Sequence, residues 1–200
     1  MRMKPIALAV SLCVLLATTP ALVRAAKTDV PTGTGIGQHL PQFTTPIIEV
    51  SDNKPKTTEF DSQRTTRPTI YIFVGTHCPA TAAYAERLTQ LEQAYEPKGI
   101  DFIYIYPNRE DSSEAKLAFH GEKKFTGRVI DDQGAKLAHL FNAQRTSELF
   151  LVNKDGTIVY HGAIDDSRDP GAVKQRYLAN ALDEMLAGRA ITTASTDVNA

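Results

Sequence analysis

The sequence predicts an α/β domain in which a central mixed sheet is flanked by helices and preceded by an N-terminal extension. Two β-type runs, Thr69–Val74 and Ile100–Tyr106, are typical of central strands covered on both faces. Between them, apolar residues recur at helical spacing: Tyr84, Leu88, Leu91 and Tyr95. Strand, helix and strand in this order form a βαβ unit, which predicts parallel strands and a right-handed crossover.

A hairpin near the end of the chain makes the predicted sheet mixed. Glu148–Val152 and Thr157–His161 are β-type runs on either side of Asn153–Gly156. Asp-Gly between two such runs is a strong hairpin signal, so we expect these two strands to be antiparallel.

Residues 1–25 are predicted to be a signal peptide rather than part of the fold. Arg2 and Lys4 form a short basic region, and Ile6–Ala17 is an apolar run of signal-peptide length. Val23–Ala25 offers small or aliphatic residues before a cleavage point. The apolar run is short for a transmembrane helix, and a retained membrane anchor is the alternative. We therefore expect an exported protein of a bacterial periplasm.

Cleavage after residue 25 would leave 175 of the 200 residues, which is one domain by length. It would remove three positive charges, so the formal net charge would change from −1 to −4. That balance favours neither nucleic acid nor an anionic membrane surface as a partner, and no stable membrane insertion is expected after signal removal. Cys13 would be lost, which leaves Cys78 with no internal disulfide to form.

The domain is predicted to cover residues 37–188, after a flexible lead-in at 26–36 that is rich in proline and glycine. Ile47–Val50 is a predicted short strand. Ser51–Pro68 is polar and is expected to be a loop, with room for one edge strand at Thr57–Phe60.

Turn and capping signals divide the rest of the chain into helices. Glu96–Gly99 ends the first helix, and Ser112 or Ser113 is expected to cap a second one that runs through Phe119. Ala135–Phe141 is predicted to be a third helix.

The last predicted helix is Pro170–Gly188, followed by a flexible tail at 189–200. Its expected buried face consists of Val173, Tyr177, Ala181, Leu182, Met185 and Leu186.

The candidate reactive group is Cys78. Gly75 allows a tight turn after the first central strand, and Pro79 suits the first position of a helix. Cys78 should therefore lie at the helix N-cap, where backbone N–H groups and the helix dipole favour a thiolate. Thr81 lies one helical turn further on, and its hydroxyl can donate to that thiolate. The alternative is that Cys78 is a small buried hydrophobic residue.

The segment Phe73–Leu88, FVGTHCPATAAYAERL, resembles the active-site segment of exported redoxin-domain proteins. These are thioredoxin-fold relatives of the alkyl hydroperoxide reductase/thiol-specific antioxidant group. The resemblance runs from about Gly37 to Gly188 and includes the Pro-x-Phe opening at Leu40–Phe43 and a small strand at Arg128–Ile130. It implies a thioredoxin-like fold and thiol-based redox chemistry.

Thr81 occupies the place of the second cysteine in a Cys-x-x-Cys centre. One sulfur cannot run a dithiol–disulfide cycle, but it can attack a peroxide, become a sulfenic acid and be reduced by an external thiol. The peroxiredoxin motif Pro-x-x-x-Thr-x-x-Cys is not met, because Tyr71 and Gly75 replace its proline and threonine. We expect a peroxide or an oxidised thiol as the substrate, with Thr76, His77, Thr81 and Arg145 as residues that support Cys78.

Arg145 is placed near the cysteine loop by the resemblance. A guanidinium there would lower the pKa of Cys78 and polarise a bound peroxide; an ordinary surface arginine is the alternative. Similar proteins carry a cis-proline where this chain has Ser147. Without proline a cis bond costs about 2.5–4 kcal/mol, so we expect a trans peptide.

No metal or other cofactor is predicted. One cysteine with His77 and four scattered histidines suggests copper binding of the Sco type, but those proteins use a Cys-x-x-x-Cys pair that is absent here. Asp131–Asp132 and Asp165–Asp166 adjoin turn signals and are interpreted as solvated turn residues.

Three functions remain open on the sequence. The first is an exported thiol peroxidase or related antioxidant redoxin, and the second is a thiol–disulfide partner that forms mixed disulfides through Cys78. The third is a redoxin domain that has lost catalysis and serves as a binding module, which Ser147 and the missing resolving cysteine favour.

Overall fold

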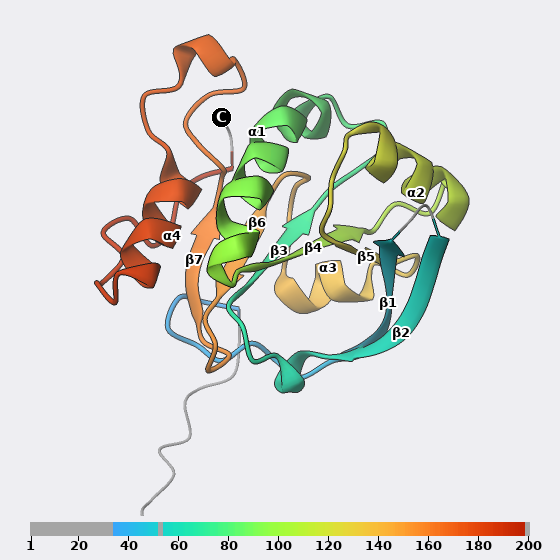
Figure 1. Ribbon diagram of the computed structural model, residues 1–200, viewed down its shortest axis with the longest axis horizontal. Coiled ribbons are helices and arrows are strands. Elements are labelled where there is room, and N and C mark those ends of the chain that lie inside the picture. The colour runs from blue at the N-terminus through green and yellow to red at the C-terminus, as the bar shows by residue number, and fades with distance from the viewer. Residues whose placement is uncertain (1–33, 52–53, 199–200) are drawn as a thin grey trace, which may run out of the picture.

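The computed structural model describes residues 34–51 and 54–198 (Figure 1). The predicted signal peptide, most of the predicted lead-in and the last two residues lie outside these ranges. The described residues form seven strands: β1 (Thr44–Ser51), β2 (Lys54–Asp61), β3 (Thr69–Phe73), β4 (Asp101–Tyr106), β5 (Arg128–Asp131), β6 (Leu149–Val152) and β7 (Ile158–Gly162). They build one mixed sheet in the order β2-β1-β5-β4-β3-β6-β7.

The predicted βαβ unit is confirmed. β3 and β4 are parallel neighbours, with Thr69 opposite Asp101 and Phe73 opposite Ile105, and β5 continues the parallel part of the sheet. Helix α1 (Pro79–Tyr95) makes the crossover between β3 and β4. Every residue of β3 is buried, as its unbroken apolar sequence predicts.

The predicted hairpin of β6 and β7 is also confirmed, and β6 pairs antiparallel with β3. A second hairpin, of β1 and β2, forms the opposite part of the sheet and is larger than the predicted strands at 47–50 and 57–60. The full length of β2 was not predicted because its sequence is polar. Lys, Thr and Glu side chains suit a solvent-exposed edge strand, where they also oppose pairing with other chains.

Helices cover both faces of the sheet. Successive side chains of β3 point to opposite faces, and since all of them are apolar or buried, each face has a core of its own. Ile70 and Ile72 pack in one core cluster with α1, α2 (Ser113–Glu122) and α4 (Tyr177–Leu186). Tyr71 and Phe73 pack in the other with α3 (Lys136–Phe141) and Phe43, Phe60. Figure 1 shows α1 and α4 side by side, and α3 across the sheet from them.

The predicted helix at 170–188 is wrong in its first part. Pro170–Ala172 form only a 3-10 turn, η3, and α4 begins at Tyr177. The carboxylate of Asp166 accepts hydrogen bonds from the backbone N–H groups of Lys174 (2.9 Å) and Gln175 (3.0 Å), which hold the intervening chain out of a helix.

The predicted buried face of α4 is corrected by the later start of the helix. Its buried residues are Leu178, Ala179, Ala181 and Leu182, whereas Leu186 is 41% exposed. Leu178 and Ala179 were therefore missed, and Leu186 was wrongly assigned to the core.

The segment predicted as a flexible tail has a defined position up to residue 198. Ser195 forms a parallel bridge with His161 of β7, and the backbone of Thr196 donates to His161 O at 3.1 Å. Thr196 Oγ1 accepts from the backbone N–H of Ala163 at 2.9 Å. β7 is the last strand of the sheet, and its free backbone groups receive this segment.

Each of the two aspartate pairs has one buried member, Asp132 and Asp165, so the interpretation of the pairs as solvated turn residues is wrong for these two. Asp131 accepts from the buried Lys116 Nζ at 2.6 Å, and Asp132 caps α3 by accepting from the backbone N–H groups of Leu137 and Ala138. Asp165 binds Arg87.

Candidate functional site

Cys78 lies at the N-cap of α1, with Pro79 at the first helical position, as the sequence predicts. The chain leaves β3 and turns back within four residues, because the Cys78 backbone N–H donates to Gly75 O at 3.2 Å. The thiol therefore stands at the carboxyl end of a central parallel strand and at the positive end of a helix dipole. Both placements favour a reactive anion.

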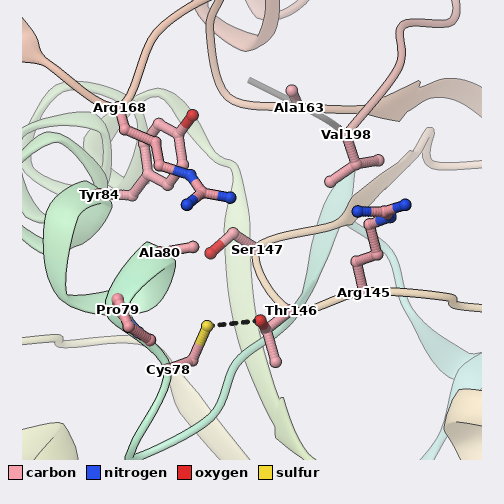
Figure 2. Close-up of a pocket in the computed structure, with 10 residues that line it drawn as sticks. All are labelled: Cys78, Pro79, Ala80, Tyr84, Arg145, Thr146, Ser147, Ala163, Arg168 and Val198. Atoms are coloured by element: carbon pink, nitrogen blue, oxygen red, sulfur yellow. Dashed lines mark hydrogen bonds between the residues drawn. The ribbon is translucent and has the colours of Figure 1, made fainter.

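Thr146 faces the sulfur. Cys78 Sγ and Thr146 Oγ1 lie 2.7 Å apart, as Figure 2 shows. Gly75 leaves the room for this approach, since a Cβ at that position would lie 3.3 Å from Thr146 Cγ2 and 3.4 Å from Cys78 Cβ. A thiolate can only accept a hydrogen bond, so the Thr146 hydroxyl is the donor when the sulfur is charged.

The pKa of the Cys78 thiol is lowered from its ordinary value. Partial burial opposes this by raising the pKa, and the hydrogen bond from Thr146 is the largest of the opposing causes. The backbone N–H groups of Thr81 and Ala80 and the hydroxyl of Thr81 add to it. These donors stabilise the thiolate, which is the nucleophilic form of cysteine.

Thr81 is fully buried beneath the sulfur. Its Oγ1 accepts from the backbone N–H of Gly75 at 3.2 Å, which leaves the hydroxyl proton to point toward Cys78. Thr81 therefore joins the turn to the helix as well as contributing to the lowered pKa.

Thr76 and His77 are not among the described residues that line the cavity beside Cys78. Both side chains bind Asp111, Thr76 through its hydroxyl and His77 through Nε2 at 3.0 Å. Asn108 binds the same carboxylate. The two residues were expected to support the cysteine, and their contacts tie the turn before α1 to the loop after β4.

Arg145 lines the cavity at Cys78 but does not hydrogen-bond to the sulfur; Thr146 takes that position. Figure 2 shows the Arg145 guanidinium turned away from Cys78 and toward Val198. The donors that lower the pKa of Cys78 are hydroxyl and backbone groups rather than the expected guanidinium.

The loop that carries Thr146 is held by its backbone. Glu148 accepts from the N–H groups of Gln144 (2.7 Å) and Arg145 (3.0 Å), and its other oxygen lies 2.6 Å from His161 Nε2. The Ser147 N–H donates to Phe73 O at 2.6 Å. These bonds join the loop to β3 and β7, and so fix Thr146 against the sulfur.

Ser147 has a trans peptide bond, as predicted, since the described residues contain no cis peptide. Its φ of +67° is in the left-handed region, which is unfavourable for serine. The side chain is 3% exposed, and none of the described residues forms a hydrogen bond with Oγ.

These residues enclose a cavity of about 330 Å³ beside Cys78. It is lined by Cys78, Pro79, Ala80, Tyr84, Arg145, Thr146, Ser147, Ala163, Arg168 and Val198 (Figure 2). Sequence reasoning missed Thr146, Arg168 and Val198, because they come from three loops that only the folded sheet brings together.

Two further findings bear on the site. Within the described ranges, no three histidine, cysteine, aspartate or glutamate side chains are grouped as metal ligands would be. No described helix has the length and apolar character that crossing a membrane requires.

The parallel βαβ unit, the following hairpin and a cysteine at the N-terminus of α1 define a thioredoxin-like fold. A family model described as Redoxin matches residues 36–177, so the chain belongs to the Redoxin family. No curated protein matches the chain in sequence.

Solved structures of several kinds share the fold. An uncharacterized conserved protein from Geobacillus kaustophilus is similar with a TM-score of 0.71 and 24% identity, over 82% of this chain and 88% of that one. A Plasmodium vivax 2-Cys peroxiredoxin has a TM-score of 0.58 and 12% identity, over 76% and 97%.

A secreted disulfide oxidoreductase from Mycobacterium tuberculosis, homologous to E. coli DsbE, has a TM-score of 0.50 and 18% identity, over 64% of this chain and 89% of that one. At these identities the likeness concerns the fold alone, and the chemistry has to be argued from the site.

Proposed function

We propose that this protein is a thiol oxidoreductase of peroxidase type that works through Cys78 and is reduced by an external thiol. The observation that carries the proposal is the 2.7 Å contact of Cys78 Sγ with Thr146 Oγ1. Cys78 is the N-cap residue of α1, and it lines the cavity. The lowered pKa of the thiol agrees with it. A partly exposed thiolate beside a cavity is accessible to a small oxidant.

The reaction has two stages. The Cys78 thiolate attacks one oxygen of a peroxide ROOH, the O–O bond breaks, and ROH leaves after protonation while the sulfur becomes a sulfenic acid. A thiol R′SH then displaces water to form a mixed disulfide with Cys78. A second R′SH releases R′SSR′ and restores the thiol, so each peroxide consumes two external thiols.

Mixed-disulfide exchange without peroxide is the second candidate. It is favoured by Gly75 and Tyr71, which replace the threonine and proline of the peroxiredoxin motif, so that Thr146 takes the place beside the sulfur. The same Cys78 would then exchange with disulfides of partner molecules, as its lowered pKa allows.

Peroxide consumption by the purified chain from residue 26 onward, with a small thiol as reductant, tests the proposal. We expect turnover that is lost in Cys78→Ser and retained in His139→Asn, a matched variant at a histidine of α3 that does not line the cavity. Equal rates for the wild type and Cys78→Ser would refute the peroxidase. Disulfide exchange by a wild type that consumes no peroxide would favour the second candidate.

We further propose that residues 1–25 direct export and are removed. The pattern of basic, apolar and small residues supports this. Intact-mass analysis of the protein recovered from a bacterial periplasm should show a chain that begins near Lys27, and a chain that retains Met1 would contradict it.

A further inference from the structure

Ser147 places a polar group without a protein partner in the cavity beside Cys78. The residue is 3% exposed, and its Oγ forms no hydrogen bond with any described residue. Figure 2 shows this hydroxyl directed into the cavity, on the side where Ala80 and the Cys78 sulfur lie. A buried hydroxyl without a partner costs free energy, and a ligand atom that accepted its hydrogen bond would remove that cost.

The backbone that carries this hydroxyl is held in an unfavourable conformation. The Ser147 N–H donates to Phe73 O at 2.6 Å, and Glu148 accepts from two backbone N–H groups of the same loop. The φ of Ser147, +67°, is unfavourable for serine, whereas glycine would adopt it without strain. A serine here therefore costs stability that a glycine would not cost, which points to a use for the side chain.

The two arginines that line the cavity do not offer the same unused donor. Figure 2 shows the Arg145 guanidinium turned away from Cys78, and Arg168 interacts with other groups of the protein. Carboxylates also lie within two residues of the lining residues in the sequence: Asp166, Asp169 and Asp197. Among the described residues that line the cavity, the buried polar side-chain atom without a partner is therefore Ser147 Oγ.

The proposed reaction needs a donor at a second place besides the sulfur. The Cys78 thiolate attacks the protonated oxygen of HOOR, an S–O bond forms as the O–O bond breaks, and the electron pair leaves on the RO oxygen. Negative charge thus passes from the sulfur to the leaving oxygen. The donors at Thr146, Thr81 and Ala80 act on the sulfur, which loses its charge. A fixed donor beside the leaving oxygen would stabilise the charge that develops there.

We propose that Ser147 is a catalytic residue whose hydroxyl donates a hydrogen bond to the leaving oxygen of the peroxide. The inference rests on the function proposed above and adds a residue to its mechanism. Ser147 keeps its own proton: the sulfur is oxidised to a sulfenic acid, the O–O bond is reduced, and RO⁻ takes a proton from solvent and leaves as ROH. The cavity, of about 330 Å³, has room for a small peroxide beside both groups.

The test compares two reactions of the same thiolate in the chain from residue 26 onward, where Cys78 is the one cysteine. Hydrogen peroxide oxidises the sulfur with loss of hydroxide, which gains strongly from a hydrogen bond. Iodoacetamide alkylates the sulfur with loss of iodide, a large ion that gains little from one. Both rate constants are measured without a reductant, from the thiol that remains with time. Their ratio cancels any change in the thiolate fraction or in access to the sulfur.

Ser147→Ala should lower the ratio of oxidation to alkylation by about tenfold or more, because it removes one donor to a developing oxyanion. Ser147→Gly also lacks the hydroxyl but relieves the strained φ, so it should show the same loss. The pH dependence of alkylation should stay that of the wild type, since Ser147 Oγ does not bond to the sulfur. With peracetic acid, which releases the more stable acetate ion, the loss should be smaller than with hydrogen peroxide.

Ser62→Ala is the matched control. This serine is also buried, but its Oγ accepts from the Phe43 N–H at 3.0 Å and it does not line the cavity. The variant should keep the wild-type ratio of oxidation to alkylation, although it loses a buried hydrogen bond.

Wild-type ratios in both Ser147 variants would overturn the inference, and so would a loss confined to one of them, which would belong to the backbone. An equal loss with hydrogen peroxide and peracetic acid would also overturn it, because a structural role would slow both alike. These outcomes leave the peroxidase standing as long as peroxide oxidises the wild type. A wild-type Cys78 that is alkylated but not oxidised would refute the proposed function, and the role of Ser147 with it.

Discussion

Replacing Thr146 by valine tests whether this hydroxyl stabilises the thiolate. Valine has nearly the same shape, so Thr146→Val removes the Oγ1 that lies 2.7 Å from Cys78 Sγ and keeps the packing against Gly75. The other causes that lower the pKa of Cys78, at Thr81 and Ala80, remain. We therefore expect the pKa of Cys78 to rise in the variant, but by only the part of the lowering that is due to Thr146.

The size of the effect follows from the one bond removed. A hydrogen bond to a charged group contributes about 1.5–3 kcal/mol, and solvent screening at the partly exposed Cys78 reduces this to about 1 kcal/mol. At a pH below the pKa of Cys78, losing about 1 kcal/mol of thiolate stabilisation lowers the thiolate fraction about fivefold. Alkylation by iodoacetamide as a function of pH, together with the ultraviolet absorbance of the thiolate, measures it.

Thr146→Ser supplies the control, because serine keeps the hydroxyl and loses only the methyl group. Its alkylation profile should stay close to that of the wild type. A Thr146→Val profile that superimposes on the wild type, in a variant with unchanged thermal stability, would show that Thr146 does not stabilise the thiolate and would refute this part of the site.

Three further predictions concern buried groups, and urea denaturation measures each of them. Ser147→Pro should destabilise the fold by roughly 2 kcal/mol or more, because proline has no N–H to donate to Phe73 O and cannot adopt a φ of +67°. Ser147→Gly should stabilise the fold by up to about 1 kcal/mol, because glycine adopts that φ without strain. Equal unfolding free energies for the wild type and these two variants would contradict a strained backbone at Ser147. Glu148→Gln should cost about 1–3 kcal/mol at neutral pH. Burial raises the pKa of Glu148, but the hydrogen bonds from His161 and two backbone N–H groups hold that pKa below its usual value of 4.5. The stabilisation by ionised Glu148 is therefore present above pH 4.5 and is lost on acidification. A Glu148→Gln variant whose stability parallels that of the wild type at every pH would refute this prediction. Burial raises the pKa of Glu92 from 4.5 to about 7, so the folded protein binds an extra proton in that window and loses stability as the pH rises through it, by at most about 3 kcal/mol. The difference between the wild-type and Glu92→Gln stability curves should show that slope, and a flat difference would exclude the raised pKa.

The parts of the fold that were predictable depend on local patterns. The strand at 69–73, the N-cap at Cys78 and the Asp155-Gly156 hairpin each follow from residues adjacent in sequence, and the structure confirms all three. Elements that depend on distant partners were less well predicted. β2 is polar because it is an edge strand, and α4 starts late because Asp166 binds the chain before it.

The candidate site shows the same division. The donors at Thr81 lie within one turn of Cys78 and were predictable from spacing, whereas Thr146 reaches the sulfur only because β6 pairs with β3. The left-handed backbone of Ser147 has no signal in residue type, since serine rarely adopts it. Arg145 was expected beside the sulfur and lies in the same cavity, but its neighbour Thr146 makes the contact.

Trapping of an oxidised Cys78 tests the central claim most directly. The reduced chain from residue 26 onward is treated with one equivalent of hydrogen peroxide in the presence of dimedone, which adds to sulfenic acids, and the modified residue is located by peptide mass spectrometry. The account predicts one dimedone adduct, on Cys78, that is suppressed when a small thiol is added together with the dimedone and competes for the sulfenic acid, and that Cys78→Ser lacks. A Cys78 that remains an unmodified thiol under these conditions, in protein whose cysteine alkylates freely, would contradict it.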